Sequence, residues 1–180
     1  MNKYWNKLNF SREYQNKVLS VDHVEYLFEK EKASMVFTVV NTSNWVIVIP
    51  ILENGKLALV KQFRVGIEDT TYEFPGGGIN FDESKESAAA RELKEETGLI
   101  SNKLTFLGEV HPNPALMSNS AYIYLATGCK KKYNLNLDMF EDIEVKYVTK
   151  QEFDNLILAG EIKHSIVLSA YALYLTKNIT

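Results

Sequence analysis

Three glutamates in one charged segment are the residues of this chain best suited to chemistry. Glu92 and Glu96 are four residues apart, and Glu95 lies three residues beyond Glu92. On a helix these spacings place all three carboxylates on one face, where they repel one another. Hard divalent cations prefer such oxygen ligands, so the crowding predicts a cation site. Cations held in this way suit phosphoryl chemistry, because they neutralise phosphate oxygens and lower the pKa of a water molecule.

A run of three glycines at 76–78 precedes these glutamates and offers backbone in place of side chains. Without a Cβ, a turn formed here can approach a bound cation closely and point the carbonyl of Gly76 at it. Further along, Arg91 can reach Glu83 if the intervening loop folds back. We expect a structural ion pair between these two side chains.

The joint spacing of these residues is more specific than either part. A charged helix alone indicates solvated surface, and a glycine run alone indicates a loop. Together they resemble the Nudix box, the signature of a family of hydrolases, at every position that its pattern specifies. The matching residues are Gly77, Glu83, Arg91, Glu92, Leu93, Glu95, Glu96, Gly98 and Leu99.

The resemblance implies hydrolysis of a nucleoside diphosphate linked to a further moiety, with Mg²⁺ as the cofactor and Mn²⁺ as the alternative. Carried over by position, Glu92 and Glu96 are the principal metal ligands. Glu95 is a ligand or their supporting carboxylate, and the Gly76 carbonyl is a further ligand. The structural positions of the box are Gly77, Glu83, Arg91 and Gly98.

Outside the box, the chain resembles the ADP-ribose pyrophosphatase branch of the family. Lys61 to Arg64, the stretch around Glu73, and Pro114 correspond to residues that this branch uses near its substrate. One departure is Gly76, where the branch usually has alanine. We therefore expect ADP-ribose or a similar nucleoside diphosphate sugar, cleaved to a nucleoside monophosphate and a sugar phosphate. Another nucleoside diphosphate derivative remains the alternative within the same chemistry.

A general base is expected in the acidic segment 137–145. The resemblance aligns Glu141 with a loop glutamate that activates the attacking water. Glu144, at the start of a predicted strand, is the rival, and Glu95 is also retained as a catalytic candidate. A merely acidic surface loop is the remaining interpretation of this segment.

The elements that must position these residues can be read from hydrophobic patterning and turn signals. Asn54-Gly55 between two apolar runs predicts a hairpin whose strands are buried on both faces. The pattern predicts an α+β fold, with an α/β/α sandwich around a mixed sheet and a small N-terminal β-sheet. The expected strands are 18–21, 24–29, 35–40, 45–52, 56–63, 71–74, 104–110, 121–126 and 144–148, and the expected helices are 84–96, 151–158 and 165–175.

We assign residues 1–43 to an N-terminal β-strand extension and residues 44–180 to the Nudix domain. The family resemblance implies a homodimer in which the extension helps to build the partner's nucleotide site, through aromatic side chains such as Phe28. A non-catalytic ADP-ribose-binding module is the competing function. It predicts a degraded box or an attached DNA-binding domain, and the sequence has neither.

Composition limits the remaining classes. A formal net charge of −3 argues against broad nucleic-acid binding, which needs a cationic surface. The N-terminus has no apolar run of the kind found in secretory signals, and no stretch is apolar enough for a membrane helix. The single cysteine, Cys129, excludes an intramolecular disulfide and favours a reducing, cytoplasmic location.

Overall fold

The computed structural model describes residues 3–177, which form two compact units. One unit comprises the chain up to Ser43 together with His111–Asn119. The other comprises Asn44–Val110 and the chain from Ser120 onward. Residues 111–119 interrupt the larger unit in sequence and belong with the N-terminal strands. The expected assignment had placed them in the larger domain.

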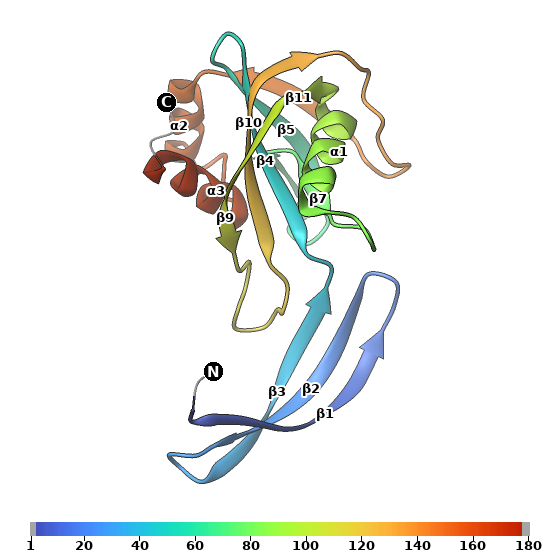
Figure 1. Cartoon of the computed structure of the whole chain (residues 1–180), viewed down its shortest axis with the longest axis vertical. Helices are drawn as coiled ribbons and strands as arrows, with labels where there is room; N and C mark the ends of the chain where they lie inside the picture. The colour runs from blue at the N-terminus through green and yellow to red at the C-terminus, as the bar shows by residue number, and fades with distance from the viewer. Residues whose placement is uncertain (1–2, 178–180) are drawn as a thin grey trace. The chain divides into compact units, whose positions relative to one another are not determined.

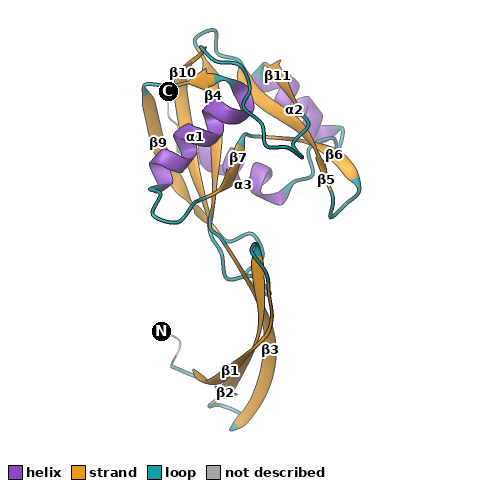
Figure 2. Cartoon of the chain, turned by 90° about the vertical axis from the view of Figure 1, so that its right-hand side faces the viewer, coloured by secondary structure: helices purple, strands orange, loops and turns teal. Residues whose placement is uncertain are grey.

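The first unit is a three-stranded antiparallel sheet in the order β1-β2-β3 (Figure 2). Its strands are β1 (Trp5–Gln15), β2 (Leu19–Phe28) and β3 (Ala33–Thr42). The two short strands expected at 18–21 and 24–29 are one continuous strand, and β1 was not predicted. Every residue of β1 is exposed, so its sequence carries no buried–exposed alternation that could mark it as a strand.

The second unit contains an eight-stranded mixed sheet. Its path is β11-β5-β4-β10-β8, with β6 beside β5, β7 beside β4 and β9 beside β10. The pair β4–β10 is parallel and the others are antiparallel. The strands are β4 (Trp45–Leu52), β5 (Leu57–Arg64), β6 (Asp69–Glu73), β7 (Gly76–Gly78), β8 (Leu99–Ile100), β9 (Lys103–Val110), β10 (Ala121–Lys131) and β11 (Ile143–Val148).

Helices cover both faces of this sheet, which confirms the expected α/β/α sandwich (Figure 1). α1 (Lys85–Thr97) lies on one face, and α2 (Lys150–Leu158) and α3 (Ser165–Thr176) lie on the other. Because successive strand residues point to opposite faces, β4 serves two cores at once. Val46 and Val48 join the core under α1, whereas Ile47 and Ile49 join the core under α2 and α3.

The predicted hairpin joins β4 to β5 through Asn54 and Gly55, and Gly55 has a φ of 79°. The two strands pair only at Ile51 and Leu57, next to the turn. Beyond that pair their facing edges diverge: β4 pairs with the short strand β7, and β5 pairs with β6.

α1 is capped at both ends. The Ser84 hydroxyl accepts a hydrogen bond from the amide of Ser87, at 3.0 Å. Gly98 ends the helix with a φ of 68°, a left-handed conformation that glycine adopts without strain. These caps fix the length of the helix that carries the three glutamates. Within residues 3–177, no helix is long and apolar enough to cross a membrane.

Candidate active site

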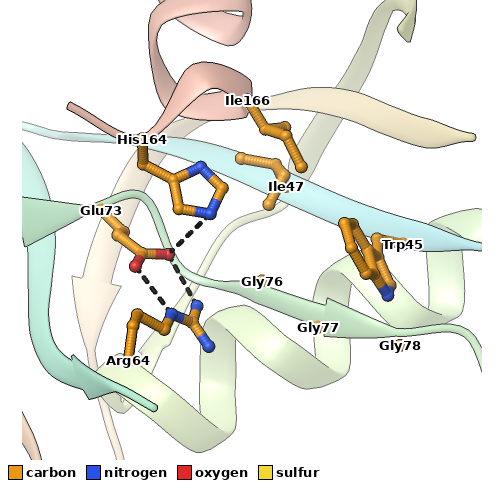
Figure 3. Close-up of a pocket in the computed structure, with 9 residues that line it drawn as sticks. All are labelled: Trp45, Ile47, Arg64, Glu73, Gly76, Gly77, Gly78, His164 and Ile166. Carbon is orange, nitrogen blue, oxygen red and sulfur yellow. Dashed lines mark hydrogen bonds and ion pairs between the residues drawn. The ribbon is translucent and has the colours of Figure 1, made fainter. Parts of the chain in front are cut away.

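A cavity of about 350 Å³ lies where β4 and β5 diverge (Figure 3). Four strands and the first turn of α3 contribute to its wall. The lining residues are Trp45, Ile47, Arg64, Glu73, Gly76, Gly77, Gly78, His164 and Ile166. The wall combines the apolar side chains of Trp45, Ile47 and Ile166 with the charged pair of Arg64 and Glu73.

The three glycines form strand β7 against β4 and are not the turn that their sequence suggested. Neither Gly76 nor Gly77 has a positive φ, so backbone conformation does not require glycine at these positions. The close approach of neighbouring atoms does. A Cβ on Gly76 would collide with the Val46 carbonyl, and a Cβ on Gly77 would collide with the Glu92 carboxylate. The missing side chains thus let α1 carboxylates lie directly against the strand.

Glu92 and Glu96 both project from α1 toward β7. The Glu96 carboxylate accepts a hydrogen bond from the Gly76 amide at 2.9 Å, and the Glu92 carboxylate lies beside Gly77. Both glutamates are buried, with relative exposures of 9% and 3%. Burial raises the pKa of Glu96 to about 8, with further contributions from the charges of Glu92 and Glu141, and burial likewise raises the pKa of Glu92.

Arg91 fastens the loop between β7 and α1 to the helix. Its Nε and Nη2 atoms donate to the two oxygens of Glu83, at 2.8 and 2.9 Å, and Nη2 also donates to the Gly78 carbonyl at 2.9 Å. This is the ion pair that we expected from the sequence. Nη1 reaches the neighbouring acids Glu92 and Glu95, at 2.7 and 3.1 Å. Hydrogen bonds from Arg91 lower the pKa of Glu83 to about 2.

The donor set fits a hard cation in chemistry, although the side chains do not form a finished cage. Among residues 3–177, no three His, Cys, Asp or Glu side chains lie close enough together to hold a metal ion as they stand. Two buried carboxylates nonetheless border successive residues of the glycine strand. Buried negative charge of this density is stabilised by a divalent cation with oxygen ligands.

Arg64 and Glu73 form a bidentate ion pair on the other side of the cavity. Arg64 Nε donates to Glu73 Oε1 at 2.8 Å, and Nη2 donates to Oε2 at 2.6 Å. The Thr71 hydroxyl also donates to this carboxylate. Although burial opposes its ionisation, the hydrogen bonds from Arg64 lower the pKa of Glu73 below its ordinary value. The pair keeps a guanidinium charge at the cavity wall.

The expected base candidates occupy three different settings. Glu141 lies exposed in the loop before β11, where its side chain accepts a hydrogen bond from the Asp138 amide at 3.0 Å. Its charge contributes to the raised pKa values of both Glu92 and Glu96. Glu144 is exposed on β11, opposite Lys61 of β5. Glu95 pairs with Arg91 and is 31% exposed.

The remaining expected substrate contacts belong to the first unit. Phe28 ends β2 and stacks on Trp5 with ring centroids 4.5 Å apart. Pro114 is exposed in the segment 111–119. Trp45 and His164 also line the cavity, and the sequence analysis assigned neither of them to the site. His164 could not be assigned because only the packing of α3 against the sheet brings it to Glu73.

These features define a Nudix-type sandwich with a glutamate-rich helix against a glycine strand. The sequence model of the NUDIX domain family matches residues 42–170, and the chain belongs to this family. Among curated relatives, an ADP-ribose pyrophosphatase of Bacillus subtilis is 33% identical over 120 residues, covering 65% of this chain and 64% of that protein. An ADP compounds hydrolase of Escherichia coli is 38% identical over 81 residues, covering 45% and 43%.

The chain therefore spans less than two thirds of the length of these relatives. A solved structure extends the similarity over most of the chain. The crystal structure of an ADP compounds hydrolase matches with a TM-score of 0.84 and 25% identity, covering 97% of this chain and 93% of that one.

Proposed function

We propose that this protein is a Mg²⁺-dependent hydrolase of the pyrophosphate bond in ADP-ribose or a similar nucleoside diphosphate sugar. The products are a nucleoside monophosphate and a sugar phosphate. One observation carries the proposal: Glu92 and Glu96 lie buried against the backbone of β7, in a unit whose cavity also presents the guanidinium of Arg64. Carboxylates for cations and an arginine for phosphate are the two requirements of diphosphate recognition.

Glu92, Glu96 and the carbonyl of Gly76 are the proposed ligands of the metal, with Glu95 as a further ligand or supporting carboxylate. Bound Mg²⁺ would supply positive charge to the diphosphate oxygens and lower the pKa of a water molecule. Gly77 keeps the space beside the Glu92 carboxylate open, and the Arg91–Glu83 pair holds the loop that follows the glycine strand.

Glu141 is the proposed general base. Its carboxylate accepts the proton of the attacking water, and its exposed loop can bring it to the substrate. Its electrostatic influence on Glu92 and Glu96 supports this choice over Glu144. Arg64 is the proposed ligand of a phosphate oxygen. Glu73 engages only the Nε and Nη2 atoms of Arg64, so the other N–H groups of the guanidinium remain for the substrate. Pro114 and Phe28 are proposed contacts for the nucleoside.

The substrate class rests on the relatives. Relatives named as ADP-ribose pyrophosphatases or ADP compounds hydrolases match this chain at 29 to 38% identity, and the matching solved structure is also an ADP compounds hydrolase. We further propose a homodimer formed through the N-terminal sheet. β1 is exposed along its whole length, and neither hydrophobic core includes a residue from the described part of the first unit. Buried, single Cys129 is in keeping with a cytoplasmic location.

Product analysis tests the proposal directly. Purified protein with Mg²⁺ is offered ADP-ribose, ADP-glucose, GDP-mannose, diadenosine polyphosphates and coenzyme A. We expect AMP and ribose 5-phosphate from ADP-ribose. In Glu96→Gln we expect kcat to fall about a hundredfold or more, because loss of a metal ligand should cost at least as much activity as loss of the residues that support the ligands. Glu86→Gln, an exposed glutamate on the same helix, is the matched control and should retain activity.

Two results would change the proposal. Preference for another compound of the panel, still abolished by Glu96→Gln, would keep the mechanism and replace the substrate. Binding of ADP-ribose without turnover of any compound would make the chain a binding module.

A further inference from the structure

The Glu73 carboxylate has one side that the Arg64 pair does not cover. Its side chain is only 2% exposed, and Arg64 and the Thr71 hydroxyl occupy two of its approaches. The imidazole of His164 covers the remaining approach, with Nε2 at 3.8 Å from Glu73 Oε2 (Figure 3). His164, Glu73 and Arg64 thus form a row along the cavity wall that begins at α3.

His164 occupies the N-cap position of α3 without using its side chain as a cap. Nδ1, the ring nitrogen nearer to the backbone, is buried and has no hydrogen-bond partner among the described residues. Burial lowers the pKa of His164; Arg64 lowers it further, and Glu73 opposes them. The lowered pKa favours the neutral ring, which carries one N–H.

The position of that proton follows from the helix. The first turn of a helix is partially positive, so it favours a lone pair over an N–H on the adjacent Nδ1 atom. The Glu73 carboxylate, which lies 3.8 Å from Nε2, likewise favours the tautomer with its proton on Nε2. At 3.8 Å this approach is longer than a hydrogen bond, so His164 contributes an oriented dipole and steric cover to the pair.

A second cavity explains why this cover matters. It has a volume of about 600 Å³, and both Arg64 and His164 also line it. If the imidazole were removed, water from this second cavity would reach Glu73. A hydrated carboxylate holds its guanidinium less firmly, because exposed ion pairs are weak and their long side chains keep their rotamer freedom.

We propose that His164 is a positioning residue that holds Arg64, through Glu73, in the orientation that binds a phosphate oxygen of the substrate. Glu73 takes two of the five guanidinium N–H groups, which leaves the others for the cavity. Arg64 is 41% exposed, so its orientation must be fixed by such partners. The inference rests on the proposed function, because it assigns Arg64 to a diphosphate.

Three variants separate positioning from simple packing. His164→Ala removes the ring, His164→Gln restores an N–H donor at the distance of Nε2, and His164→Asn places its donor near Nδ1 instead. We expect His164→Ala and His164→Asn to raise KM for ADP-ribose about tenfold while kcat changes less than about threefold, and His164→Gln to stay within about threefold of wild type in both. His23→Ala, beside Glu13 in the first unit, is the control and should change neither value.

A double-mutant cycle and a spectrum provide the decisive readouts. In an Arg64→Ala background, His164→Ala should raise KM no further, because His164 affects substrate binding only through Arg64. The protein has three arginines, Arg12, Arg64 and Arg91, so the NMR signals of their Nε–H groups can be assigned. Loss of His164 should accelerate exchange of the Arg64 Nε proton with water and leave Arg12 and Arg91 unchanged.

Each outcome decides the inference. Additive effects of Arg64→Ala and His164→Ala, or unchanged Arg64 exchange in His164→Ala, would overturn it. If circular dichroism shows that His164→Ala is unfolded, the comparison passes to His164→Gln and His164→Asn. The same KM and the same Arg64 Nε exchange rate in these two variants would then overturn the inference. If wild type hydrolyses none of the compounds, the proposed function fails, and the exchange of the Arg64 proton still shows whether His164 positions Arg64.

Discussion

At the scale of the residue, geometry distinguishes Arg64 from a generic positive charge. Its planar guanidinium binds both oxygens of Glu73 while directing further N–H groups to the cavity. Lysine has the same charge and cannot make both contacts. We expect Arg64→Lys to raise KM for ADP-ribose about tenfold in steady-state assays.

Arg12 provides a matched control for this substitution. It forms the same kind of bidentate pair with Asp22 in the first unit, at 2.8 and 3.2 Å. Arg12→Lys should leave KM within about twofold of wild type. Equal KM values in wild type and Arg64→Lys would contradict a bidentate role for Arg64.

Gly77 tests whether the space beside Glu92 is required. A Cβ at this position meets the Glu92 carboxylate, and displacement of a reacting group by about 1 Å costs roughly a hundredfold in rate. We expect Gly77→Ala to lower kcat/KM by about this factor while the protein stays folded. Gly66→Ala, whose new Cβ would meet no atom within 4 Å, should have no such effect. Full activity of Gly77→Ala would show that the carboxylate can move aside.

At this scale the sequence predicted what local spacing determines. The separation of Glu83 from Arg91 predicted their ion pair, and the helical spacing of Glu92 and Glu96 predicted a shared face. His164 could not be found in this way, because it is 91 residues from Glu73 in sequence and reaches it only through the packing of α3.

At the scale of the element, the β7–α1 loop depends on one ion pair whose strength varies with pH. Hydrogen bonds from Arg91, and then from the Asn80 amide, lower the pKa of Glu83 from 4.5 to about 2. A depressed pKa means that the folded state favours the ionised form. The stabilisation is therefore present above the ordinary pKa and is lost as the pH falls toward 2.

Glu83→Gln measures this contribution. We expect the free energy of unfolding at pH 7 to fall by about 1.5–3 kcal/mol, the usual value for a hydrogen bond to a charged group. Denaturant titrations should show this difference shrinking as the pH falls below 4.5. A difference that stays constant down to pH 3 would mean that ionisation of Glu83 does not stabilise the loop.

Elements that bury a patterned face were predictable, and those that bury nothing were not. β4 alternates between two cores and was found with its hairpin turn. β1 shows no burial, so the N-terminal sheet was expected with the wrong strands. β7 was misread as a turn, because glycine usually indicates one and only the contacts with Glu92 and the Val46 carbonyl explain a strand of glycines.

At the scale of the whole molecule, the N-terminal sheet is the part that lacks a core of its own. Trp5 and Phe37 are 40% and 36% exposed and line a shallow apolar hollow with Tyr26. A three-stranded sheet needs a covered hydrophobic face to be stable. A second copy of the chain would cover it, and the homodimer proposal follows from this requirement.

Light scattering coupled to size exclusion tests the dimer at micromolar concentration. We expect twice the 20.6 kDa mass of the chain for wild type. Combined replacement of Trp5 and Phe37 by serine should return the mass to that of one chain, because aromatic contacts dominate the energetics of such interfaces. Both cores lie outside the first unit, so this variant should keep the thermal unfolding midpoint of the larger unit when measured as a monomer. A monomeric wild type would contradict the dimer and leave the exposed sheet available to a different partner.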